Sequence, residues 1–106
     1  MGWRKTTLTI LNGATESDVL DLTERSARPK ADIFFFAPAT LPETVTVQVA
    51  PDPGGTFIPL QSGGSNYTLP AAKATYITFV CGAVKLVAGG PVGGDRVFTI
   101  RGAAVA

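Results

Sequence analysis

Hydrophobic and polar residues alternate along much of this chain with a period of two, the pattern of half-buried β-strands. The clearest example is the segment 44–49, in which valines occupy one face and threonine and glutamine occupy the other. Similar but less clear alternation predicts strands at 7–10, 17–23 and 96–101. No segment shows a comparably clear helical period, so the pattern predicts an all-β protein.

The run 33–36 does not alternate, because it reads Ile-Phe-Phe-Phe. In a strand, Ile33 and Phe35 would share one face, and Phe34 and Phe36 would share the other. Only one face of a strand points into the core of a two-layer sandwich. The second face therefore needs another cover, and the sequence leaves two open: a neighbouring loop or edge, or a second subunit.

Turn signals divide the remaining strands. The sequence Pro-Asp-Pro-Gly-Gly at 51–55 predicts a hairpin between 44–49 and 56–60, with Pro59 at an edge or a bulge. A short strand is expected at 66–69, and a buried strand at 75–81 is expected to pair with 83–87 across Gly82.

Eight or nine short strands in a chain of 106 residues predict an antiparallel β-sandwich or small jelly roll. The predicted domain spans 7–101, with an N-terminal arm at 1–6 and a C-terminal tail at 102–106. Short arms of this kind are poorly ordered unless a partner holds them. A chain of this length buries roughly two-thirds of its unfolded surface, so neither a metal nor a disulfide is needed for folding.

Charge and composition point to a protein partner. Charged residues make up 16% of the chain and the net charge is +1, whereas about 25% charged residues is usual. A small domain with so few charges is expected to cover part of its surface with a partner. The basic residues are scattered, so no direct contact with nucleic acid is expected.

The chain offers little for catalysis. It contains no histidine and a single cysteine, Cys81, which is expected to be a buried, inert thiol. Asp18 and Asp21 would face opposite sides of a strand, so they do not form an acid and base pair. The glycine-rich segment 89–95 lacks the Lys-Ser/Thr of a phosphate-binding loop, and Asp52 fits a plain turn better than a calcium loop. We expect no enzyme activity, no cofactor and no metal.

The chain is expected to be soluble and made in the cytoplasm without a membrane partner. The segment 1–11 is basic but lacks the apolar stretch and cleavage site of a signal peptide. No apolar run approaches the roughly 20 residues that span a bilayer.

The order of elements resembles that of small virion structural proteins of tailed bacteriophages. In those proteins a strand ending at a Pro-Ala step precedes a hairpin with an Asp-Gly-Gly-Thr-aromatic turn, and a final strand ends the domain. The matching stretches here are 17–22, 33–41, 44–60, 75–87 and 96–101. The chain departs from the pattern where Pro51 and Pro53 flank Asp52, and where Phe57 replaces a frequent tryptophan.

The resemblance implies a non-enzymatic decoration or cement protein that binds across subunits of the major capsid protein on the outside of the virion. It also implies a homo-oligomer, often a trimer. Two alternatives remain: a carbohydrate-binding or host-attachment module of a fibre or baseplate, and a tail or neck component.

The predicted contact residues lie in an arm, in the apolar run and in a loop that is expected to be mobile. Trp3 in the arm could anchor in an adjacent subunit or pack on its own domain. The loop spans 89–94. The full set is Trp3, Arg4, Lys5, Phe34, Phe36, Gly90, Pro91 and Val92.

Overall fold

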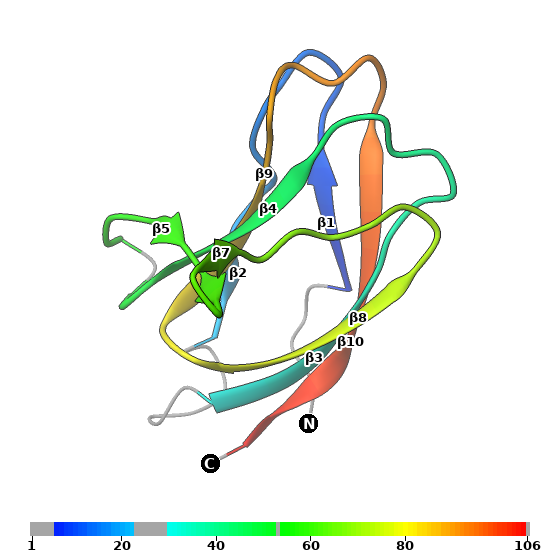
Figure 1. Cartoon of the computed structure of the whole chain (residues 1–106). Coiled ribbons are helices and arrows are strands. Elements are labelled where there is room, and N and C mark those ends of the chain that lie inside the picture. Colours follow the sequence, from blue (N-terminus) through cyan, green and yellow to red (C-terminus); the bar gives the residue numbers. More distant parts are fainter. Residues whose placement is uncertain (1–5, 23–29, 53, 106) are drawn as a thin grey trace.

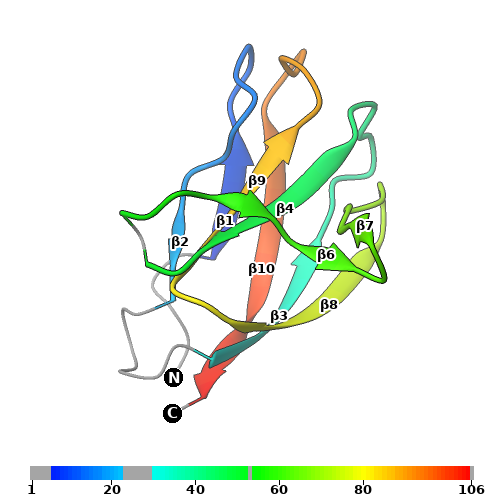
Figure 2. The same ribbon diagram turned by 60° about the vertical axis from the view of Figure 1, so that its left-hand side comes forward.

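Two four-stranded antiparallel sheets face each other in the computed structural model, which describes residues 6–22, 30–52 and 54–105 (Figure 1). We call them sheet A and sheet B. Sheet A contains, in spatial order, β1 (Thr7–Ile10), β10 (Arg96–Val105), β3 (Lys30–Phe36) and β8 (Ala74–Val80). Sheet B contains β2 (Leu20–Asp21), β9 (Ala83–Ala88), β4 (Val45–Ala50) and β5 (Ile58–Pro59). A small hairpin of β6 (Gln61–Ser62) and β7 (Ser65–Asn66) follows β5 (Figure 2).

This strand order is that of a jelly roll. The chain changes sheet at almost every connection, so that β1, β3, β8 and β10 enter sheet A while β2, β4, β5 and β9 enter sheet B. Each inner strand consequently pairs with strands distant in sequence, as in β10 between β1 and β3. The predicted all-β sandwich is therefore confirmed, and the described residues contain no helix able to cross a bilayer.

The core fills the space between the sheets with alternate residues of their strands. Phe35 and Phe79 meet there edge to face, with ring centroids 5.9 Å apart, a favourable geometry for two aromatic rings. The buried side chains of the core include Leu8, Ile10, Leu20, Leu22, Ile33, Phe35, Val45, Val47, Leu69, Ile77, Phe79, Val84, Leu86, Phe98 and Ile100. The alternation read from the sequence thus identifies the inward-facing residues of both sheets.

The predicted hairpin between 75–81 and 83–87 is wrong. β8 pairs with β3 in sheet A, whereas β9 pairs with β4 and β2 in sheet B. The turn at Gly82 is therefore a corner at which the chain leaves sheet A for sheet B. Gly82 is buried there, and its amide donates to the carbonyl of Ala50 at 3.0 Å. A Cβ at Gly82 would overlap the backbone of Pro51.

The boundaries of two strands differ from the prediction at one end of the β3–β10 ladder. β3 begins at Lys30, and β10 continues to Val105, because residues 30–33 pair with residues 102–105. Residues 102–105 are therefore strand and not a free tail. Gly102 permits this pairing, since a Cβ at that position would overlap the carbonyl oxygen of Asp32.

Two other predicted strands are shorter than expected. In the segment predicted at 17–23, the described strand is β2, and Ser17 forms an isolated bridge with Ile10. In the segment predicted at 66–69, Asn66 ends β7 and Thr68 bridges to Thr46 of β4. The hairpin of β4 with β5 is confirmed, with Val49 opposite Ile58.

Candidate docking surface

The outer face of sheet A, turned away from sheet B, carries a cluster of exposed aromatic side chains. β3 lies between β10 and β8, so its outward side chains stand in the interior of the sheet and not at an edge. Phe34 and Phe36 point outward and are 44% and 43% exposed, while Ile33 and Phe35 point inward and are fully buried. No described segment covers this face. Cover by a described loop, one of the two alternatives, is therefore not observed.

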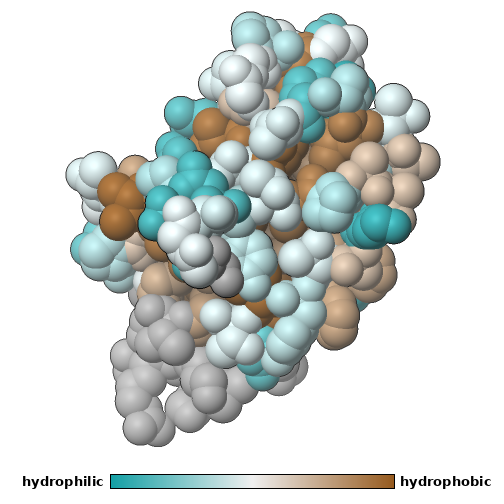
Figure 3. Space-filling view, in the orientation of Figure 1, coloured by the Kyte–Doolittle hydropathy of each residue, from teal (hydrophilic) through white to brown (hydrophobic). Residues whose placement is uncertain are grey.

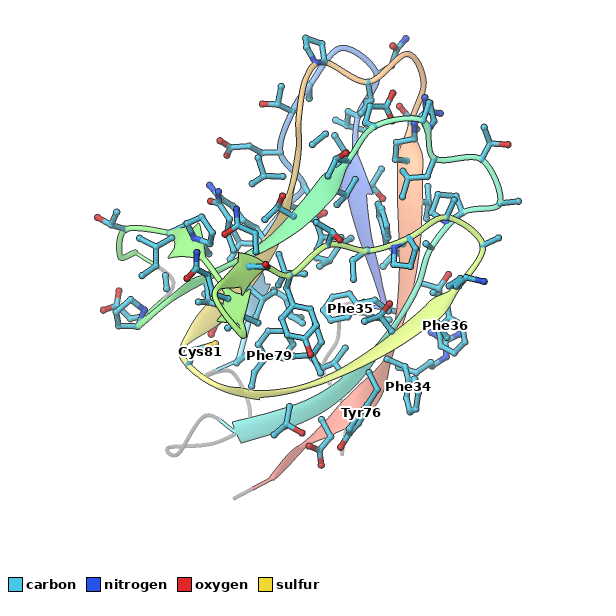
Figure 4. The ribbon with its side chains drawn as sticks, viewed as in Figure 1. Phe34, Phe35, Phe36, Tyr76, Phe79 and Cys81 are labelled. Carbon is cyan, nitrogen blue, oxygen red and sulfur yellow. The ribbon has the colours of Figure 1, made fainter. Side chains whose placement is uncertain are left out.

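A third ring extends the cluster onto β8. Tyr76 lies directly opposite Phe34 in the β3–β8 ladder and is 50% exposed. The ring centroids of Phe34 and Tyr76 are 5.0 Å apart, and those of Phe34 and Phe36 are 6.2 Å apart. Figure 4 shows the three side chains projecting from the same side of the sheet. We call Phe34, Phe36 and Tyr76 the aromatic patch.

Polar groups border the aromatic patch along β8. The Thr78 hydroxyl donates to the Asp32 carboxylate at 2.8 Å and lies 3.3 Å from the Tyr76 hydroxyl. Val97 of β10 adds an exposed apolar side chain to the same face. In the space-filling view, apolar side chains interrupted by a hydrophilic group lie along the right-hand margin, where β3 ends and β8 begins (Figure 3). The surface is apolar at its centre and polar at its border, the usual anatomy of a protein interface.

The loop at 89–94 does not join this surface. Val92 is only 2% exposed, because it packs into the core, and its backbone exchanges bonds with the 11–14 turn. Its amide donates to Ala14 at 3.0 Å and its carbonyl accepts from Gly13 at 2.8 Å. The prediction of Val92 as an exposed contact residue is therefore wrong. Pro91 is exposed and Gly90 half-buried, but the loop lies at the opposite end of the sandwich from the aromatic patch (Figures 1 and 4).

The predicted contact residues of the N-terminal arm lie outside the described residues. Trp3, Arg4 and Lys5 precede Thr6, where the described structure begins. Of the five predicted contact residues that the structure describes, two lie in the aromatic patch, Phe34 and Phe36, and three lie in the loop at 89–94. Anchoring of Trp3 in an adjacent subunit, or its packing on its own domain, stays a prediction.

Two ion pairs tie loops and strands together away from the aromatic patch. Arg96 donates from Nε and Nη2 to the two carboxylate oxygens of Glu43, at 3.0 and 3.1 Å. This bond with Arg96 holds the pKa of Glu43 below its usual range, and it raises the pKa of Arg96. Lys85 bonds Glu16 at 2.9 Å and lies 4.6 Å from the ring centroid of Phe57. In both arrangements the charged side chains are paired with groups of the same chain.

The described residues show no group of acidic, histidine or cysteine side chains that could hold a metal ion. The Asp52 carboxylate accepts the amide of Gly54 at 3.1 Å, which is the role of an aspartate in a turn. Cys81 is half-buried, and burial raises the pKa of its thiol, the opposite of what an activated cysteine needs. None of these groups forms a reactive constellation.

Tyr76 is the member of the aromatic patch that the sequence analysis did not select. Its signal was present, since Tyr76 and Thr78 alternate with Thr75, Ile77 and Phe79 in the strand. The alternation places Tyr76 on the outer face. What the sequence could not supply was the pairing of β8 with β3, which sets the tyrosine beside Phe34.

Comparison of the chain with protein-family models, with curated proteins and with solved structures finds no match in any of the three. Jelly rolls occur in viral capsid proteins, in lectins and in cupins. Because one fold serves such different functions, the fold does not choose among them. The function must be argued from the surface itself.

Proposed function

We propose that this protein is a non-enzymatic structural protein of a bacteriophage virion, and that it decorates the head by docking onto the major capsid protein. The observation that carries the proposal is the aromatic patch, three neighbouring rings each 43% to 50% exposed on one sheet face. Large aromatic side chains clustered on a sheet face are typical of binding surfaces, where they supply much of the binding free energy.

The shape and charge of this surface suit docking on a capsid. A pleated sheet offers a broad face that can lie against another protein over the area a stable interface needs, about 800 Å² per partner. Because the chain carries few charges, burying its surface against a partner costs less free energy of desolvation. Many copies on one shell would add interface area between capsid subunits, so each modest contact would contribute to the stability of the whole shell.

The proposal also rests on the resemblance of the strand order and hairpin to small virion proteins of tailed bacteriophages. The jelly-roll order is compatible with that class, because capsid proteins use it.

Sedimentation with capsid shells tests the proposal. Shells assembled from the major capsid protein of the same virus are mixed with purified protein and pelleted. We expect the wild-type protein to pellet with the shells, and Phe34→Thr to remain largely in the supernatant. Leu11→Thr is the matched control, because Leu11 is a 60% exposed apolar residue that follows β1, and β10 separates β1 from β3. Wild-type protein that stays in the supernatant would contradict the proposal.

Carbohydrate binding is the second candidate, since exposed aromatic rings on one sheet face are also what a sugar-binding module requires. The hydroxyls of Tyr76 and Thr78 and the carboxylate of Asp32 lie beside the rings and could bond to sugar hydroxyls. However, Phe34 is tilted by 33° and 44° against its two neighbours, so the rings do not form one flat platform. Binding to a glycan array that Phe34→Thr abolishes would favour this candidate over capsid docking.

A further inference from the structure

The free edge of β8 is the second unusual feature of sheet A. β8 lies at the margin of the sheet and pairs only with β3 among the described strands (Figures 1 and 2). In an antiparallel ladder, residues alternate between bonding to the partner strand and directing their amide and carbonyl groups away from it. The phase of this alternation decides which groups of β8 are left on the outside.

A single hydrogen bond fixes that phase. The amide of Ala37 donates to the carbonyl of Lys73 at 3.1 Å, so this pair, which continues the β3–β8 register, is a hydrogen-bonded one. The bonded residues of β8 are therefore Thr75, Ile77 and Phe79. The residues that direct their backbone groups away from β3 are Ala74, Tyr76, Thr78 and Val80. No hydrogen bond from the described part of the chain reaches those outward groups.

The other edge strands of the two four-stranded sheets, β1, β2 and β5, are short or blocked. On β1, the outward amide of Thr9 donates to the Asp18 carboxylate at 2.9 Å. The Leu60 amide donates to the Val47 carbonyl, so Leu60 and Val47 form a hydrogen-bonded pair. The preceding residue of β5, Pro59, therefore takes the outward position, and proline has no amide hydrogen to donate there. β2 contributes only two residues. Such devices keep sheet edges from pairing with other chains.

β8 carries no such device. Its seven residues, Ala-Thr-Tyr-Ile-Thr-Phe-Val, include no charge, no proline and no glycine. A long, uncharged edge made of strand-favouring residues is a template for pairing with another strand. We propose that β8 pairs with β8 of a second copy of this chain, antiparallel and across a two-fold axis, to join two sheets A into one continuous sheet.

The sequence of β8 is compatible with pairing to β8 of a second copy in this arrangement. With the axis at Ile77, Tyr76 lies opposite Thr78 of the second copy, and Ala74 lies opposite Val80. These are the residues with outward backbone groups, so each can exchange both hydrogen bonds with its opposite number. A shift by one residue would set outward groups against inward ones and would turn the side chains to the wrong face. Because β8 is uncharged, the pairing sets no like charges against each other.

The axis stands perpendicular to the joined sheet, so both aromatic patches lie on the same side of it. The ring of Tyr76 would then adjoin Thr78 of the second copy, just as the two hydroxyls adjoin within one chain at 3.3 Å. The dimer does not rest on the proposed capsid function. Phe34→Thr leaves the β8 edge intact and is expected to remain dimeric, so the two proposals fail independently.

Light scattering coupled to size exclusion tests the dimer across a dilution series. We expect wild-type protein to have the mass of a dimer, and Thr78→Pro, which removes one outward amide, to have the mass of a monomer. Thr78→Ala is the matched control, because it removes the same hydroxyl and keeps the amide. A wild-type monomer at every concentration, a trimer, or a dimeric Thr78→Pro variant would overturn the proposal.

Hydrogen exchange of the wild-type protein gives a second readout that needs no variant. The amides of Tyr76 and Thr78 point away from β3, so in a monomer they exchange rapidly, whereas that of Ile77 is bonded to β3. In the proposed dimer the amides of Tyr76 and Thr78 exchange slowly, and faster on dilution. Rapid exchange of both at high protein concentration would overturn the proposal.

Discussion

Phe34 and Phe35 are adjacent phenylalanines on one strand, and they occupy opposite environments. Phe35 is fully buried between the sheets and packs against Phe79, whereas Phe34 is 44% exposed and contacts Tyr76 and Phe36. The inner ring removes its entire surface from water on folding. The outer ring leaves nearly half of its surface for something else. The same residue type therefore serves the fold on one face and is available to a partner on the other.

The difference extends from these two rings to the two sides of sheet A. On the inner side, buried residues from both sheets interlock, and changes in volume are costly there. On the outer side, Thr78 and the aromatic patch are exposed to solvent. Substitutions should therefore separate folding from binding by face.

The largest effect is expected for Phe35→Thr. This substitution leaves a cavity and places a hydroxyl in an apolar core, so the free energy of unfolding should fall by more than about 3 kcal/mol. Urea denaturation followed by far-ultraviolet circular dichroism measures the loss. A loss as small as that caused by substituting an exposed residue would contradict the contrast drawn between Phe35 and Phe34.

Gly82→Ala should have the next largest effect, because it adds volume to the inner side at the corner between the sheets. The new Cβ would overlap the backbone of Pro51, which cannot move as a side chain can. We expect a loss of about 1–3 kcal/mol in the free energy of unfolding. Gly90→Ala is the control, since a Cβ there meets no atom within 4 Å. Equal stability of the two variants would contradict the close approach.

A smaller, pH-dependent effect is expected at the surface ion pair of Glu43 and Arg96. Folding lowers the pKa of Glu43, so the pair stabilises the protein above the unfolded pKa. That contribution is lost as the pH falls through the lower, folded pKa. The Glu43→Gln variant should melt lower than wild type near neutral pH, and this difference should shrink at acid pH. A difference in melting temperature that does not change with pH would contradict this assignment.

The smallest effect is expected in the alkylation rate of Cys81, whose side chain is half-buried. Because burial raises the pKa of its thiol, alkylation by iodoacetamide should be slower in the folded protein than in urea-unfolded protein at the same neutral pH. It should accelerate as the pH rises. Mass spectrometry at timed intervals measures the rate, and equal rates in the folded and unfolded states would contradict the expected protection.

The sequence predicted the face of each residue better than it predicted the partners of each strand. Alternation correctly placed Phe34 outward and Phe35 inward, because side-chain direction is a local property of a strand. The pairing of β8 was predicted incorrectly, because two consecutive apolar strands across a glycine can form either a hairpin or a corner between sheets. The pairing of β8 with β3 and of β9 with β4, each between residues far apart in the sequence, decides between them.

The residues of the candidate docking surface show the same contrast between side-chain direction, which is local, and strand pairing, which is not. Phe34 and Phe36 were identifiable, since three consecutive phenylalanines cannot all face the core of a two-layer sandwich. Val92 was misread because its glycine-rich surroundings suggest a mobile loop, whereas one buried side chain and two backbone bonds hold it in place. Tyr76 was not selected, because its proximity to Phe34 depends on pairing between residues far apart in sequence.

The most direct test of the account is the free energy of unfolding of the double variant Phe34→Thr and Phe36→Thr, compared with Phe35→Thr in the same urea series. Threonine favours strands, so we expect the double variant to lose about 1 kcal/mol per ring at most. Phe35→Thr should lose more than both outer substitutions together. If the double variant loses as much as Phe35→Thr, the outer rings serve the fold, and the aromatic patch is not a surface kept for a partner.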